Sequence, residues 1–160
     1  MALACTILEQ LALIFFVDSS AGQSICSCSE AFSNLRTCSI EIDGVAGSLH
    51  VRGIGTVTLF TTDADGKMVV ILLHNCLQCD SQYNLISVSQ LQSRPGNFAH
   101  TSNVDPSLHI DHNSGVGVLP LEIQAGLPGL RVQRSPITPV SCRVSGTIHS
   151  PISFDHCYSS

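Results

Sequence analysis

The residues Asp18-Ser19-Ser20-Ala21 place a carboxylate directly after the apolar run Leu11–Val17. Such a run predicts a buried strand, so Asp18 is expected where that strand ends in a turn. A carboxylate held at a tight turn by hydroxyl and amide donors can share a proton with a second carboxylate. Asp and Ser are also common where an ordinary strand ends, because their side chains hydrogen-bond nearby backbone. The tetrapeptide therefore permits acid–base chemistry without requiring it.

A second informative segment is residues 51–59, in which two glycines precede an alternating strand. Val57 and Leu59 share one face of this strand, and threonines occupy the other. We expect Gly53 and Gly55 to frame the tip of a mobile hairpin.

The elements that position these segments are mainly strands. The apolar patterns predict strands at residues 11–17, 38–43, 56–61, 68–73, 107–110 and 116–123. A turn at residues 62–67 joins two of them, because its Asp-Gly pair favours the left-handed conformations that close hairpins. One short helix is expected at Ile86–Leu91. A hairpin formed by residues 107–123 is expected to close the sheet into a barrel.

The chain resembles the protease-like β-barrel segment of Pol polyproteins from copia-type LTR retrotransposons, which is related to the retroviral aspartic proteases. Four pieces carry the resemblance, in the family's order: the run into Asp18-Ser19-Ser20-Ala21, where the family has Asp-Ser-Gly-Ala; Val51–Thr56; Leu72–Leu77 followed by Asn84–Leu91; and Gly126–Leu130. Together they span about residues 11 to 132. The resemblance implies an all-β, closed or partly open barrel of the retropepsin type.

The resemblance also implies a mechanism. A chain with one aspartate motif must form a homodimer, in which Asp18 of each subunit faces the other and the pair shares a proton. Asp18 is then the catalytic acid or base, and Ser19 hydrogen-bonds across the dimer. The residues expected to contact a polyprotein peptide substrate are Ser20, Ala21, Gly53, Ile54 and Gly55. Ile86 and Ser87 are expected to brace the Asp18 loop.

Ser20 departs from the family pattern, because the family has glycine there and glycine lets a peptide backbone approach closely. This difference leaves two interpretations open. The domain is either an aspartic endopeptidase or a non-catalytic β-barrel that serves a structural or interaction role. A third alternative, a small secreted disulfide-linked β protein, is suggested by the apolar N-terminus and the cysteines.

Composition and charge argue against several other classes of function. The chain has 160 residues, of which 44% are hydrophobic, and it has no Trp, so Val, Ile and Leu must build the core. A net charge of −5 with Lys67 as the single lysine argues against direct nucleic-acid binding. No apolar run reaches the length of a membrane span, so no membrane association is expected. We expect an N-terminal extension at residues 1–10, the barrel at 11–132 and a linker or disordered tail at 133–160.

The sequence has eight cysteines, at positions 5, 26, 28, 38, 76, 79, 142 and 157. In a secreted chain they would form disulfides, whereas in a reducing compartment they would be buried apolar residues or free thiols. Cys76 and Cys79 have the spacing of a zinc knuckle, but no second pair has standard spacing. We therefore expect free thiols, no metal, no cofactor, and a cytoplasmic location inside an element particle.

Overall fold

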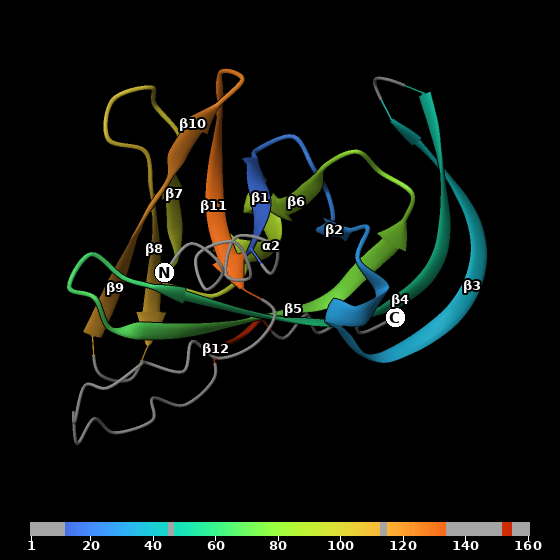
Figure 1. The fold of residues 1–160 in the computed structure, drawn as a ribbon, viewed down its shortest axis with the longest axis horizontal. Helices are drawn as coiled ribbons and strands as arrows, with labels where there is room; N and C mark the ends of the chain where they lie inside the picture. Colours follow the sequence, from blue (N-terminus) through green and yellow to red (C-terminus); the bar gives the residue numbers. More distant parts are fainter. Residues whose placement is uncertain (1–11, 45–46, 113–114, 134–151, 155–160) are drawn as a thin grey trace, which may run out of the picture.

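The computed structural model describes residues 12–44, 47–112, 115–133 and 152–154 (Figure 1). Within them the chain is mostly β-strand, with one short α-helix and one 3-10 turn. The elements are β1 (Ala12–Asp18), β2 (Ile25–Cys26), the 3-10 turn η1 (Ser29–Ala31), β3 (Phe32–Gly44), β4 (Gly47–Thr62), β5 (Met68–Cys79), β6 (Asn84–Ser87), α2 (Val88–Gln92), β7 (Phe98–His100), β8 (Ser107–His112), β9 (Gly115–Pro120), β10 (Glu122–Gln124), β11 (Leu127–Gln133) and β12 (Ile152–Phe154). The predicted all-β class with one short helix is confirmed.

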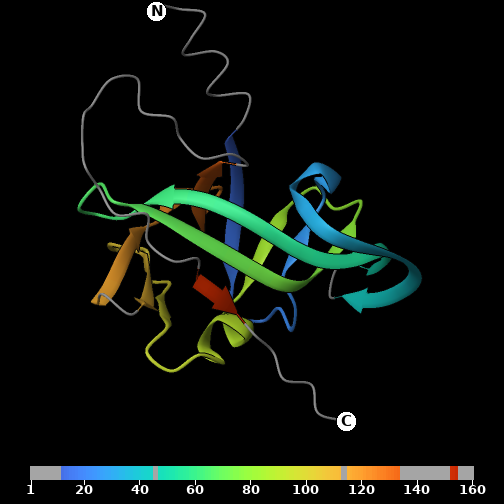
Figure 2. The ribbon, with the colours of Figure 1, turned by 90° about the horizontal axis from the view of Figure 1, so that it is seen from below.

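The main sheet has nine strands, in the order β10-β11-β1-β6-β2-β5-β4-β3, with β12 beside β5. Strand β11 also pairs with β4 through Gln133 and Phe60, so the hydrogen bonding returns on itself and forms a ring (Figure 2). A second sheet contains β7, β8 and β9. Among the described residues, no helix has the length and apolar character needed to cross a membrane.

The core is built from alternating strand residues. Phe15 and Val17 point inward from β1, and Val57 and Leu59 do so from β4, as the alternation predicts. Side chains of the second sheet, including the fully buried Leu108, join the same cluster. The second sheet therefore packs on the ring, and one core holds both.

Residues 53–55 do not form the predicted hairpin tip. Gly53 and Gly55 lie inside β4, which pairs with β3 on one side and β5 on the other. They are glycines because β3 approaches closely: a Cβ at Gly55 would lie 3.0 Å from Leu35 Cα, and one at Gly53 would lie 2.7 Å from Leu35 Cδ1. Strand β3 ends at Gly44 and β4 begins at Gly47, and the two residues between them lie outside the described residues.

Two other expectations need correction. Strands β8 and β9 form the predicted hairpin, but it belongs to the second sheet, and the β11–β4 pair closes the ring instead. The helix begins at Val88 rather than Ile86, because Ser87 caps it in an extended conformation. The predicted domain bounds stay a prediction. Within the predicted tail, Gln133 ends β11 and residues 152–154 form β12, and the remaining residues of the tail, like the predicted extension at 1–10, lie outside the described residues.

The turn at residues 62–67 is confirmed. Asp63 Oδ1 accepts hydrogen bonds from the backbone of Asp65 at 3.0 Å and Lys67 at 2.8 Å, and Gly66 has a φ of 79°. Local side-chain chemistry thus closes the β4–β5 hairpin.

A strained residue in the β10–β11 turn gives a stability prediction. Ala125 has a φ of 50° and Gly126 a φ of 80°, the signs that a two-residue hairpin loop of type I′ requires. Alanine is disfavoured there, whereas asparagine tolerates this conformation. Ala125→Asn should therefore raise the free energy of unfolding by about 1 kcal/mol, measured by urea denaturation.

The matched control is Ala64→Asn in the β4–β5 turn, because Ala64 is exposed and has no positive φ. Its effect should stay within about 0.5 kcal/mol. Equal effects of the two substitutions would contradict the strain at Ala125.

Candidate functional site

The Asp18 loop begins at the end of β1, as predicted. Asp18 pairs in register with Ser87, the last residue of the parallel strand β6. Its Oδ1 accepts a hydrogen bond from the Ser20 backbone N–H at 2.7 Å, which fixes the carboxylate over the turn. Asp18 is half-buried, and Ser19 and Ser20 are exposed. The backbone of Ser20 is not in the left-handed region, so its side chain introduces no strain of that kind.

Ser87 braces this loop, as predicted. Its side chain is fully buried, and its Oγ donates to the Ala21 carbonyl at 2.6 Å. The same Oγ accepts from the Gln90 backbone N–H at 3.2 Å and so caps α2. Ile86 pairs opposite Val17 on β1. One serine hydroxyl therefore joins the loop to the start of the helix.

Ser24 and Gln90 complete the bracing, and sequence reasoning missed both. Gln90 Oε1 accepts from the Ser24 backbone N–H and from Ser24 Oγ, each at 2.8 Å. Ser24 Oγ in turn accepts from the Ser87 backbone N–H at 3.1 Å. The Ser-x-x-Gln spacing of a capping box was the available signal, but it predicts a contact from Gln90 back to Ser87 rather than to Ser24.

A small cavity lies behind the loop, with a volume of about 10 Å³. Its lining residues are Ser24, Leu73, His74, Ile86, Ser87, Gln90 and Leu91. This volume is about that of one water molecule, so a peptide cannot enter it. Any peptide at Asp18 must lie on the exposed side of the loop, where Ser20 and Ala21 are accessible.

The other predicted substrate-binding residues have a different setting. The backbone of Gly53 and Ile54 pairs with both neighbouring strands. Gly55 pairs with β5 and lies at a break in the β3 register, where β3 still passes close to it, so this stretch lacks the free edge that main-chain pairing with a peptide needs. Their role in substrate binding stays a prediction, and it draws no support from this position.

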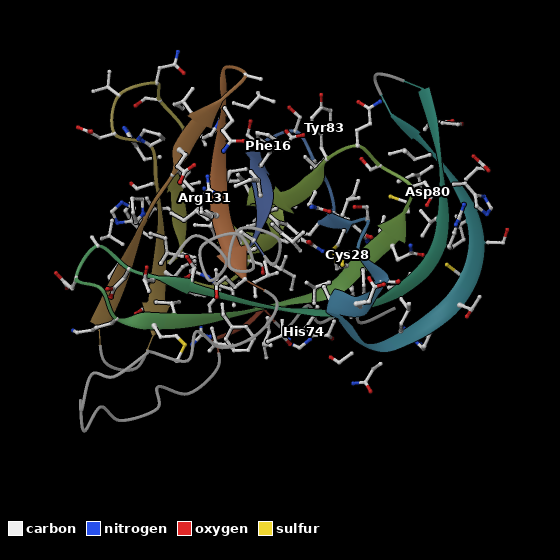
Figure 3. All side chains as sticks on the ribbon, in the orientation of Figure 1. Phe16, Cys28, His74, Asp80, Tyr83 and Arg131 are labelled. Carbon is white, nitrogen blue, oxygen red and sulfur yellow. The ribbon has the colours of Figure 1, made fainter. Side chains whose placement is uncertain are left out.

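The outer face of β1 carries an aromatic pair next to the site. Phe16 lies two residues before Asp18 and contacts Tyr83 edge to face, with ring centroids 5.5 Å apart (Figure 3). Tyr83 is 52% exposed. An apolar surface therefore lies beside the carboxylate, on the same strand.

The cysteines form no metal centre in the described part of the chain. No disulfide joins any two of the five described cysteines, which are Cys26, Cys28, Cys38, Cys76 and Cys79. The other three cysteines lie outside the described residues. No described group of three or more His, Cys, Asp or Glu residues has a metal-binding arrangement. Burial raises the pKa of the Cys76 thiol well above its ordinary value, and the neighbouring Cys26 and Cys79 raise it further.

A second polar cluster lies on the β3–β4 hairpin. His50 Nδ1 lies 2.8 Å from Glu41 Oε1, and His50 Nε2 lies 3.4 Å from Ser39 Oγ. The order serine, histidine, carboxylate is that of a hydrolase triad. All three residues are exposed, so water screens the pair and competes for its hydrogen bonds. We interpret this cluster as a surface contact of the hairpin.

The segment that holds the Asp18 loop matches a known family. Residues 15–95, just over half of the chain, match the family described as Pol polyprotein, beta-barrel domain. The match includes the loop, β6 and α2, and thus every hydrogen bond of the bracing described above. No curated protein and no solved structure matches the chain.

The bracing hydroxyl can be tested by Ser87→Ala. This substitution removes the helix cap and the short bond to the Ala21 carbonyl at a fully buried position. We expect the free energy of unfolding to fall by about 2 kcal/mol in urea denaturation. Ser19→Ala is the control, because Ser19 is an exposed serine of the same loop and its replacement should change stability by less than about 0.5 kcal/mol. Equal losses for the two variants would contradict the bracing role.

Because the Cys76 thiol is buried, we expect the protein to lose stability at alkaline pH. The folded protein holds the Cys76 proton more tightly than the unfolded chain, whose thiol titrates near its ordinary pKa of 9.0. Deprotonation above that pH therefore favours unfolding, by at most about 1.4 kcal/mol per pH unit for one thiol. Urea denaturation at pH 8, 9.5 and 10.5 should show a steeper decline for the natural protein than for Cys76→Ala. Parallel declines would show that this thiol does not contribute.

Proposed function

This chain belongs to the family of Pol polyprotein β-barrel domains, and we propose that it is a copia-type unit whose Asp18 loop forms half of an aspartic-protease site. One observation carries the proposal: the loop at the end of β1 is tied to β6 and α2 through Ser87. That bracing holds the half-buried carboxylate in a fixed turn, which acid–base chemistry at Asp18 needs.

The second half of the site would come from a second copy of the chain, because one loop supplies one carboxylate. In the dimer, one Asp18 accepts a proton from the attacking water while the protonated partner donates to the scissile carbonyl oxygen. Collapse of the tetrahedral intermediate breaks the peptide C–N bond, and the leaving amine takes a proton. Ser19 would hydrogen-bond across the two-fold axis. The pair formed by the half-buried Phe16 and the exposed Tyr83 would offer apolar surface near that axis.

The substrate would be an extended polyprotein segment, lying across the exposed side of the loop at Ser20 and Ala21. This role would place the domain in the cytoplasm, within the particle of its element. Gly53, Ile54 and Gly55 would not pair with the peptide through their backbone, because that backbone is already paired.

A second candidate function is a non-catalytic structural or interaction domain of the polyprotein. Ser20 favours this alternative, because its Cβ and hydroxyl occupy the position where the family's glycine admits the peptide backbone. Ser87 also replaces a glycine of the retroviral enzymes, and the structure uses its hydroxyl to hold the loop. Both serines are compatible with a stable fold that does not catalyse.

Cleavage of a polyprotein-derived peptide tests the protease function. We expect slow hydrolysis by the natural chain, no hydrolysis by Asp18→Asn, and at least about tenfold faster hydrolysis by Ser20→Gly, which removes crowding at the peptide backbone. Mass spectrometry of the products measures all three. Ser29→Gly is the matched control for Ser20→Gly, because it makes the same change at an exposed serine outside the Asp18 loop and should leave the rate unchanged.

Sedimentation at several concentrations separates the two candidate functions. A folded and dimeric Ser20→Gly protein that leaves the peptide intact would contradict the protease and support the non-catalytic domain. A strict monomer at high concentration would do the same, because a single carboxylate cannot complete the site.

A further inference from the structure

The cavity behind the Asp18 loop has a mixed lining of polar and apolar groups. It lies between β5 and the β6–α2 junction, and its volume is about 10 Å³. Four of its seven lining residues are polar: Ser24, His74, Ser87 and Gln90. A cavity of about this size holds a water molecule where its lining offers polar groups that can bond to it.

Gln90 supplies a donor for a guest in this cavity. The end of the Gln90 amide that faces Ser24 must be the oxygen Oε1, because the Ser24 backbone N–H can only donate a hydrogen bond. The other end of the amide is therefore Nε2, which has two N–H donors. No described residue accepts a hydrogen bond from Nε2, although Gln90 is only 7% exposed and lines the cavity. A buried amide without an acceptor is unfavourable and rare in proteins.

We propose that the cavity is a binding site for one water molecule, which accepts a hydrogen bond from Gln90 Nε2. The volume admits a single water and excludes larger molecules. None of the lining residues is Asp, Glu, Lys or Arg, so a neutral guest suits the site better than an ion. Ser24 Oγ lines the same space, donates to Gln90 Oε1 and accepts from the Ser87 backbone N–H, so its second lone pair can accept a hydrogen bond from the water. Gln90 Nε2 and Ser24 Oγ together give the water the two polar partners that a buried water needs.

With this water in place, both ends of the Gln90 side-chain amide would be held. Oε1 binds the end of the Asp18 loop at Ser24, and Nε2 would bind the water in the cavity. The inference does not depend on catalysis, because it concerns how the loop is held. It applies equally to a protease and to a non-catalytic domain.

A crystal structure of the natural chain at high resolution tests the site directly. We expect a density peak inside the cavity within about 3.2 Å of Gln90 Nε2. The substitution Gln90→Met keeps the length of the side chain and removes both polar atoms, so the peak should be lost. Gln92→Met is the matched control, because Gln92 is an exposed glutamine of the same helix and its replacement should leave the peak in place.

A cavity without density in the natural protein would overturn the proposal, and so would a peak that persists in Gln90→Met. If Gln90→Met fails to fold, the natural chain still decides the question by NMR. A cross-relaxation peak between the Gln90 side-chain amide and a long-lived water supports the site. If other buried waters of the protein are detected and the Gln90 amide shows no such peak, the proposed water site is rejected.

Discussion

The parallel pairing of β1 with β6 is the constraint on which the rest of the site depends. It brings the end of β1 beside the start of α2, and buried hydrogen bonds among Ser24, Ser87 and Gln90 fix the loop that follows. The same loop leads into β2, whose register beside β5 is set partly by the bond from the Leu77 backbone N–H to the Ser24 carbonyl. Polar groups with no exposure must be paired, so this network admits few alternative arrangements.

Local patterns were sufficient for much of the fold. The apolar run before Asp18, the alternation at Val57 and Leu59, and the Asp-Gly turn after β4 each depend on neighbours in sequence, and each appears in the structure. The helix was also predicted, with its start two residues too early. Its first turn could not be placed from propensity alone, because the extended conformation of Ser87 comes from its tertiary contacts.

The predictions failed where distant segments decide the conformation. Two glycines close together indicate a turn, yet Gly53 and Gly55 are required by an irregular stretch of β3 that passes close to them. The contact between Ser24 and Gln90 spans 66 residues of sequence. The hairpin of β8 and β9 was predicted, but it was assigned to the wrong sheet. The periodicity of a strand shows which face is buried, but it does not show which strand lies beside it.

The irregularity of β3 has a consequence for solubility. Among the described residues this strand pairs only with β4, so its other edge is exposed over much of its 13 residues. Two breaks in its register and the left-handed backbone at Asn34 interrupt the regular row of donors and acceptors along that edge. An edge distorted in this way is a poor template for strand addition. The distortion therefore disfavours pairing of β3 with the corresponding edge of a second copy.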